Sequence, residues 1–113
     1  MSKLVEKIEH YMAVSKELGL DLSEDLISKA TEDLVPSIYK QDAETVSCSD
    51  SEELDTVKKN FLQNKLGVNA NDATLDAAIK GVCEAMGTSN RHKYRALFYA
   101  LLAKEFGKES VYA

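Results

Sequence analysis

Both arginines of the chain lie in one basic stretch, where Arg91 and Arg95 are separated by one helical turn. Ser89, Asn90 and Lys93 supply further hydrogen-bond donors in the same stretch. If a helix begins here, its free backbone amides and these side chains could together hold an anion or a phosphoryl group. Cations at the start of a helix oppose the helix dipole, so their presence favours a bound negative charge. This stretch is therefore our candidate anion-binding site.

A second interpretation of the two arginines needs no ligand. On the expected helix, Arg91 and Arg95 border the apolar stripe that contains Phe98 and Leu102. Their stems can pack on the core while their guanidinium groups reach carboxylates of the acidic N-terminal helices. We expect internal ion pairs in preference to an external anion site. Burial of both arginines against carboxylates would remove the reason for a ligand, whereas an open pocket around them would support one.

The residue types needed for metal binding or nucleophilic catalysis do not occur at useful spacings. His10 and His92 belong to different expected helices, and His10 falls on a polar face. The sequence contains no Cys-x-x-Cys or His-Glu-x-x-His spacing, no Gly-x-Ser-x-Gly elbow and no glycine-rich phosphate loop. We therefore expect no metal, no cofactor and no catalytic residue, and we predict that the protein is not an enzyme.

The two cysteines are Cys48 and Cys83, and nothing at the N-terminus resembles a secretory signal. This predicts a cytoplasmic location, where a disulfide is not the expected state, so we predict two free thiols. Cys83 lies at the edge of an apolar helical stripe and should be buried. Cys48 lies among serines and an aspartate and should be exposed or half-exposed.

Length and composition fit one globular domain that spans residues 1–113. Of these 113 residues, 44% are hydrophobic and 29% are charged, and only one is proline. No run approaches the roughly 20 apolar residues that a membrane-spanning helix needs, so we expect no membrane partner. The net charge is −5, yet residues 88–113 carry five bases and two acids. The simplest explanation of this uneven distribution of charge is a basic C-terminal part that packs among acidic helices.

Hydrophobic residues recur at spacings of three and four through nearly the whole chain, which indicates an all-α fold. We expect a compact bundle with one short helical turn near Pro36 and an irregular connection over residues 41–51. The last helix is apolar nearly all round its middle, so we place it at the centre. Five main helices are expected, at about residues 3–18, 23–34, 49–66, 71–86 and 88–106.

Polar residues mark the expected starts of three of these helices. Ser23 can cap the second helix, and Ser49 can form a capping box with Glu52 at the start of the third. Asn71 or Asp72 can cap the fourth. Each cap satisfies backbone amides that have no partner in the first turn.

The fourth helix, a short turn and the basic start of the last helix follow one another in the order of a helix-turn-helix motif. The net charge of −5 opposes binding to nucleic acid. The apolar belt of the last helix would also face solvent if this helix lay in a groove. Nucleic acid is therefore the less favoured partner.

Five short runs carry a resemblance to a known family. They are PSIY at residues 36–39, VKKNFL at 57–62, LDAAI at 75–79, SNR at 89–91 with KYRA at 93–96, and FGKESVYA at 106–113. Together they resemble a family of small uncharacterised bacterial proteins that carry only a domain-of-unknown-function label. The resemblance covers most of the chain from Pro36 onward and implies a compact helical bacterial protein. It brings no catalytic or binding residue with it.

The sequence as a whole predicts a small acidic protein of the cytoplasm that acts as a non-catalytic interaction or binding module. A protein partner and self-association are both compatible with it. The alternative is a binder of anions or phosphoryl ligands, or an enzyme accessory. That alternative would use Ser89, Asn90, Arg91, Lys93 and Arg95.

Overall fold

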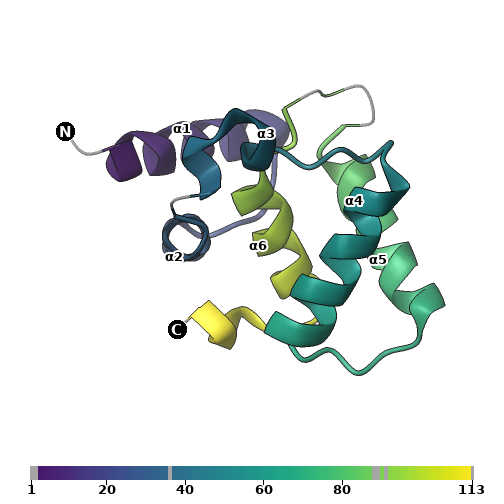
Figure 1. Ribbon diagram of the computed structural model, residues 1–113. Coiled ribbons are helices and arrows are strands. Elements are labelled where there is room, and N and C mark those ends of the chain that lie inside the picture. The colour runs from purple at the N-terminus through teal and green to yellow at the C-terminus, as the bar shows by residue number, and fades with distance from the viewer. Residues whose placement is uncertain (1–2, 36, 88–89, 91, 113) are drawn as a thin grey trace.

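The fold is all-α, as seen in a computed structural model (Figure 1). The structure describes residues 3–35, 37–87, 90 and 92–112. The main helices are α1 (Lys3–Leu18), α2 (Glu24–Asp33), α4 (Ser51–Thr56) with its continuation η2 (Val57–Lys65), α5 (Asp72–Ala85) and α6 (Arg95–Glu105). Shorter pieces of helix are η1 (Ser37–Tyr39), α3 (Gln41–Glu44) and η3 (Glu109–Tyr112). The predicted bundle and its short turn next to residue 36 are confirmed.

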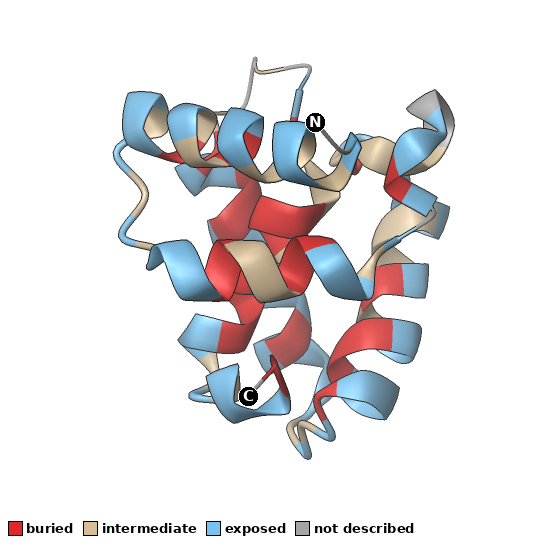
Figure 2. Cartoon of the chain, turned by 90° about the vertical axis from the view of Figure 1, so that its left-hand side faces the viewer, coloured by how far each residue is buried: buried red, intermediate tan, exposed pale blue. Residues whose placement is uncertain are grey.

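The last main helix, α6, lies at the centre of the bundle. It packs against α1, α2, α3 and α5. Figure 2 shows that buried residues gather in the interior and that the outer faces of the helices are exposed. Six of the eleven residues of α6 are buried: Ala96, Leu97, Phe98, Ala100, Leu102 and Ala103. The predicted central position of this helix is confirmed. Within the described residues, no helix has the length and apolar character needed to span a membrane.

The third main helix changes its winding where α4 passes into η2. η2 is a π-helix, in which hydrogen bonds join residues five apart, and the bond from the Leu66 amide to the Phe61 carbonyl measures 2.8 Å. Buried side chains recur at the same spacing, Val57 with Leu62 and Phe61 with Leu66. The wider helix keeps both pairs on the buried face. The three-and-four spacing had predicted one regular α-helix here.

Two of the predicted helix caps are confirmed and one is wrong. Ser23 Oγ and Asn71 Oδ1 each accept a hydrogen bond from the amide three residues later, at 3.1 and 2.8 Å. α4 is capped by Asp50, whose Oδ1 accepts from the amides two and three residues later. The predicted cap, Ser49, instead places its hydroxyl 3.3 Å from that of Ser47. A carboxylate also interacts favourably with the positive end of the helix dipole, which favours Asp50.

α6 begins at Arg95 and not at or before Asn90, as the sequence had predicted. Asn90 Oδ1 accepts a hydrogen bond from the His92 amide at 2.9 Å, so this side chain closes a local turn. The Val46 amide then donates to the Lys93 carbonyl at 2.8 Å. This long-range pairing holds the backbone extended just before α6, and the helix starts only beyond it.

The connection over residues 41–51 is more regular than predicted. Its first part forms α3, which packs against α6. An isolated antiparallel bridge then pairs Thr45 with Tyr94. The connection is therefore tied to the start of α6, and it brings two segments about fifty residues apart into contact.

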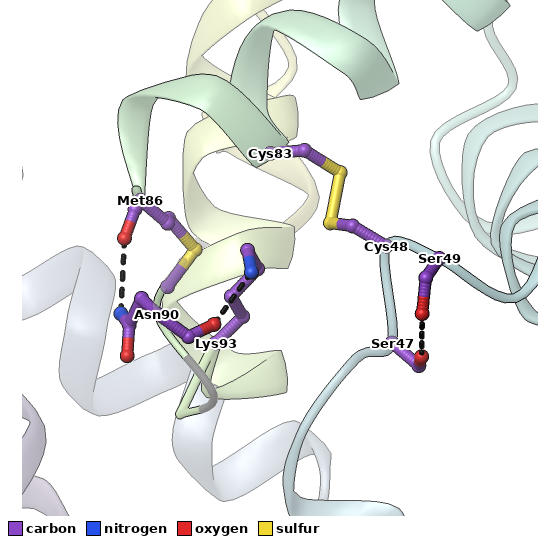
Figure 3. The surroundings of a disulfide bond; sticks show 7 residues. All are labelled: Ser47, Cys48, Ser49, Cys83, Met86, Asn90 and Lys93. Carbon is purple, nitrogen blue, oxygen red and sulfur yellow. Dashed lines mark hydrogen bonds between the residues drawn. A yellow bond between two sulfur atoms is a disulfide. The ribbon is translucent and has the colours of Figure 1, made fainter. Parts of the chain in front are cut away.

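Cys48 and Cys83 are joined by a disulfide bond, so the prediction of two free thiols is wrong (Figure 3). Their Cα atoms are 6.1 Å apart, within the usual range for a disulfide. The predicted exposures of the two cysteines are confirmed, since Cys83 is 8% exposed and Cys48 is half-buried. The two residues are 35 apart in sequence, so they meet only in the folded chain.

Candidate functional site

Arg95, in the first turn of α6, reaches into the junction between α3 and α4. Its Nε donates to the Ala43 carbonyl at 2.8 Å, and its Nη2 donates to the Thr45 carbonyl at 3.2 Å. Nη1 donates to the Tyr99 hydroxyl at 3.0 Å, and Nη2 also forms an ion pair with Glu53. The predicted internal ion pair is thus confirmed for Arg95. Its acid lies in α4, however, and not in the N-terminal helices.

These contacts keep the Arg95 guanidinium group charged and use most of its hydrogen-bond donors. Burial alone would favour the neutral guanidine, but the Tyr99 hydroxyl and the Glu53 carboxylate outweigh it and raise the pKa of Arg95 above its usual value. Four hydrogen bonds use most of the five N–H donors of the guanidinium group. Arg95 is therefore an anchor between helices, with little donor capacity left for a ligand.

A second group of polar side chains ties α1 to α3. Glu44 Oε2 accepts hydrogen bonds from Lys7 Nζ at 2.5 Å and from the Tyr11 hydroxyl at 2.6 Å. Burial alone would raise the pKa of the Glu44 carboxyl, but these two donors hold it below the usual value. Burial, reinforced by the neighbouring carboxylate, raises the pKa of Tyr11, so its hydroxyl keeps the proton that it donates. Lys7, Tyr11 and Glu44 are thus partners of one another and hold α1 against α3.

The two histidines approach the same aromatic ring, which the sequence did not reveal. The ring centroid of Tyr94 lies 5.2 Å from that of His10 and 6.1 Å from that of His92. His10 Nε2 is hydrogen-bonded to the Tyr94 hydroxyl at 3.0 Å, and burial raises the pKa of Tyr94. His92 precedes α6 and is not helical, contrary to prediction. In the part of the chain that the structure describes, no cluster of three His, Cys, Asp or Glu side chains could hold a metal ion.

A cavity of about 530 Å³ lies beside the disulfide, between the segment that follows α3, helix α5 and the segment that precedes α6. Pockets of about 300–1,000 Å³ are usual for small-molecule ligands. Its polar lining comes from Thr45, Ser47, Ser49, Lys80, Glu84, Asn90 and Lys93. Figure 3 shows the two serines on one side of the disulfide and Asn90 with Lys93 on the other.

Lys93 is the only buried charged residue among those described, with an exposed fraction of 6%. Its ammonium group donates to the Asn90 carbonyl at 2.5 Å (Figure 3). Asn90 is itself held by its side-chain amide, which donates to the Met86 carbonyl at 2.9 Å. No carboxylate oxygen among the described residues lies within 4.0 Å of the Lys93 ammonium nitrogen, the distance limit for an ion pair. An ammonium group has three N–H donors, so Lys93 can donate further hydrogen bonds into the cavity.

The five residues predicted to bind an anion fall into three groups. Asn90 and Lys93 line the cavity. Arg95 turns away from it, into the junction of α3 and α4. Ser89 and Arg91 lie outside the described residues. The candidate site is thus a cavity beside an extended segment, and not the predicted start of a helix.

Five polar residues of the cavity were not identified from the sequence: Thr45, Ser47, Ser49, Lys80 and Glu84. Ser47 and Ser49 flank Cys48, and Lys80 lies one turn before Cys83 on α5. They join Lys93 only because the disulfide and the bridge to the connection fold the segments together. The pairing of the two cysteines was the one signal that could have placed the serines next to Lys80.

Comparison with known protein families gives one match. Residues 9–110 match the model of a family described as a protein of unknown function, DUF2853. The matched range includes both cysteines and all the residues that line the cavity. A comparison with curated proteins found no match.

Proposed function

The chain belongs to the DUF2853 family of proteins of unknown function, and from its own geometry we propose that it is a non-catalytic binding module for a ligand with an anionic group. The anionic group occupies the cavity beside Lys93. The module works inside a bacterial cytoplasm. Its binding residues are Lys93, Lys80, Ser47 and Ser49, of which only Lys93 belongs to the alternative anion site considered from the sequence.

The burial of Lys93 carries this proposal. Removing a charged ammonium group from water costs several kcal/mol unless hydrogen bonds or an opposite charge replace the lost hydration. Lys93 is 6% exposed, and its ammonium group has a single hydrogen bond within the described residues, to the neutral Asn90 carbonyl. A bound anion would supply both the missing charge and further acceptors. The cavity provides the space for it.

The other polar side chains of the cavity favour an oxyanion such as a phosphate, a sulfate or a carboxylate. The hydroxyls of Ser47 and Ser49 can donate to its oxygens, and Lys80 adds a second positive charge. Glu84 lines the same cavity and would repel an anion. The anionic group should therefore lie on the Lys93 side, and a neutral or cationic part of the ligand should lie near Glu84.

Two features support binding without catalysis. His10 and His92 contact Tyr94 and do not line the cavity, so neither can act as a base for the serines there. Cys48 and Cys83 are joined, and a disulfide sulfur is not a nucleophilic thiolate. We therefore assign the cavity to recognition of a ligand and not to its chemical conversion.

Nucleic-acid binding through a helix-turn-helix motif receives no support from the position of α6. This helix would have to enter the groove, yet six of its eleven residues are buried inside the protein. A recognition helix needs exposed side chains that reach the edges of the bases. Binding of an anionic small molecule requires no such exposure.

Titration calorimetry with inorganic phosphate tests the proposal. The unmodified chain should bind phosphate with one site, and Lys93→Met should weaken binding at least about tenfold, because a hydrogen bond to a charged group is worth about 1.5–3 kcal/mol. Lys16→Met is the matched control, since Lys16 is exposed on α1 and does not line the cavity. If the two variants bind phosphate equally well, or the unmodified chain shows no binding, the proposed function is wrong.

A further inference from the structure

The disulfide between Cys48 and Cys83 forms part of the wall of the Lys93 cavity, and it also lines a second hollow of about 440 Å³. Cys48 is half-buried, whereas Cys83 is 8% exposed. A thiol from solution therefore reaches the Sγ atom of Cys48 more readily than that of Cys83. Lys80 lines both hollows; Glu84 and Lys93 also line the first, and Asp55, Asp76 and Lys58 also line the second.

The disulfide is also what ties residues 47–49 to α5. In the part of the chain that is described, the hydrogen bonds of Ser47 and Ser49 stay inside their own segment. The Asp50 amide donates to the Ser47 carbonyl at 3.3 Å, and the two serine hydroxyls lie 3.3 Å apart. Val46 is held separately, by its backbone hydrogen bond to the segment before α6. Breaking the S–S bond therefore releases residues 47–49 and leaves the attachment at Val46 in place.

We propose that this disulfide is a reversible thiol–disulfide exchange site and that its redox state controls anion binding in the Lys93 cavity. The co-reactant is a dithiol. One of its thiolates attacks the Sγ atom of Cys48, a mixed disulfide forms there, and the bond to Cys83 breaks so that Cys83 leaves as a thiolate. The second thiol of the reductant then displaces Cys48. Two electrons and two protons pass to the cysteines, and the reductant is oxidised to its own disulfide.

Lys80 favours the first of these steps. It lies three residues before Cys83 on α5, so the two side chains are neighbours on one face of the helix. A nearby ammonium group stabilises a thiolate. Cys83 is therefore a good leaving group when Cys48 is attacked.

The control of binding rests on the proposed function of the cavity. In the oxidised chain the disulfide holds the hydroxyls of Ser47 and Ser49 at the cavity before a ligand arrives. Donors that are ordered in advance bind more tightly, because the ligand does not bear the cost of ordering them. Reduction removes that order, and about a tenfold loss of affinity follows from the renewed freedom of two side chains.

A reversible disulfide is compatible with the cytoplasmic location that we propose. Disulfides in a reducing compartment are usually transient and catalytic or redox-sensing, whereas structural ones persist in oxidising compartments. The core of the protein does not depend on this bond, because the buried face of α6 packs against α1, α2 and α5. The reduced chain is thus expected to stay folded.

The test compares the full-length chain before and after treatment with dithiothreitol. Maleimide labelling should show that both cysteines become reactive, circular dichroism should show that the helices remain, and calorimetry should show phosphate affinity falling about tenfold. Oxidised glutathione should restore the affinity. Cys48→Ser/Cys83→Ala should bind phosphate like the reduced chain under both conditions, and the control Lys16→Met should respond like the unmodified chain.

Each other outcome has a defined meaning. If the reduced chain unfolds, or binds phosphate as tightly as the oxidised chain, the proposed control of binding is overturned. If neither form binds phosphate, the proposed function of the cavity is wrong. Amide hydrogen exchange at residues 47–49 then tests, without any ligand, whether reduction of the disulfide releases this segment. Faster exchange in the reduced chain supports the release of this segment, and equal exchange in both forms overturns it.

Discussion

Replacement of Arg95 by methionine tests how the central helix is anchored. Methionine keeps much of the apolar stem of arginine and removes the guanidinium group. The substitution leaves the Glu53 carboxylate without its ion-pair partner and removes the donor to the Tyr99 hydroxyl. The carbonyls of Ala43 and Thr45 lose their donors as well. Arg95→Met therefore removes the Arg95 side-chain contacts that tie α6 to α3 and α4.

The expected loss of stability follows from the burial of the pair. Breaking a fully buried ion pair by removing one partner costs about 3–5 kcal/mol. The side chain of Glu53 is 25% exposed and that of Arg95 is 13% exposed, so water can reach the carboxylate once the arginine is gone. We therefore expect a smaller loss of about 2–3 kcal/mol in the free energy of unfolding. For a chain of this size the melting temperature should fall by roughly 10 °C.

Unfolding in guanidinium chloride, followed by circular dichroism at 222 nm as the usual helix signal, measures this loss. Arg95→Lys keeps the charge but not the planar fork, so it should fall between the unmodified chain and Arg95→Met. In a Glu53→Gln background the arginine substitution should cost less, since no charge is left unpaired. A loss below about 0.5 kcal/mol for Arg95→Met, typical of an ordinary surface substitution, would refute the anchoring role.

Two further predictions concern acid stability and helix capping. The pKa of Glu44 is lowered in the folded chain, so its contribution is fully present above about pH 4.5, its ordinary value, and is lost as the pH falls through the lower folded value. Unfolding of the unmodified chain and of Glu44→Gln should be measured from pH 7 to pH 2, and the difference between their unfolding free energies should shrink toward low pH. A constant difference would contradict the ion pair with Lys7. Asp50→Ala should lower the unfolding free energy by about 1 kcal/mol, whereas Ser49→Ala should have little effect. The reverse order in thermal melts would restore Ser49 as the cap of α4.

Features that depend on nearby residues could be predicted from the sequence. The ends of α1 and η2 are marked by Gly19 and Gly67, whose φ angles of 70° and 65° lie in the left-handed region that favours glycine. Ser23 and Asn71 act on amides only three residues away. The central position of α6 follows from a composition that leaves no polar side to face solvent. Each of these signals is contained within one helix and its flanks.

Features that depend on contacts between distant segments could not be predicted. The start of α6 is set by the hydrogen bond between Val46 and Lys93, which has no signature in either segment alone. The disulfide was excluded by an argument about compartment, which does not consider where folding places Cys48 and Cys83. The cavity could not be predicted either, because its walls are formed by the disulfide and by the segments that this backbone hydrogen bond joins. Lys93 was identified as a donor, but its burial appears only in the folded chain.

We propose above all that the Lys93 ammonium group binds an anion, and this is tested most directly by observing the lysine itself. The oxidised full-length chain, labelled with ¹⁵N-lysine, would be titrated with inorganic phosphate while the side-chain ammonium resonances are followed by NMR. We predict saturable shifts of the Lys93 and Lys80 ammonium signals, with no comparable shift of Lys16 on α1. Unchanged Lys93 and Lys80 signals, or shifts shared equally by all three lysines, would contradict it.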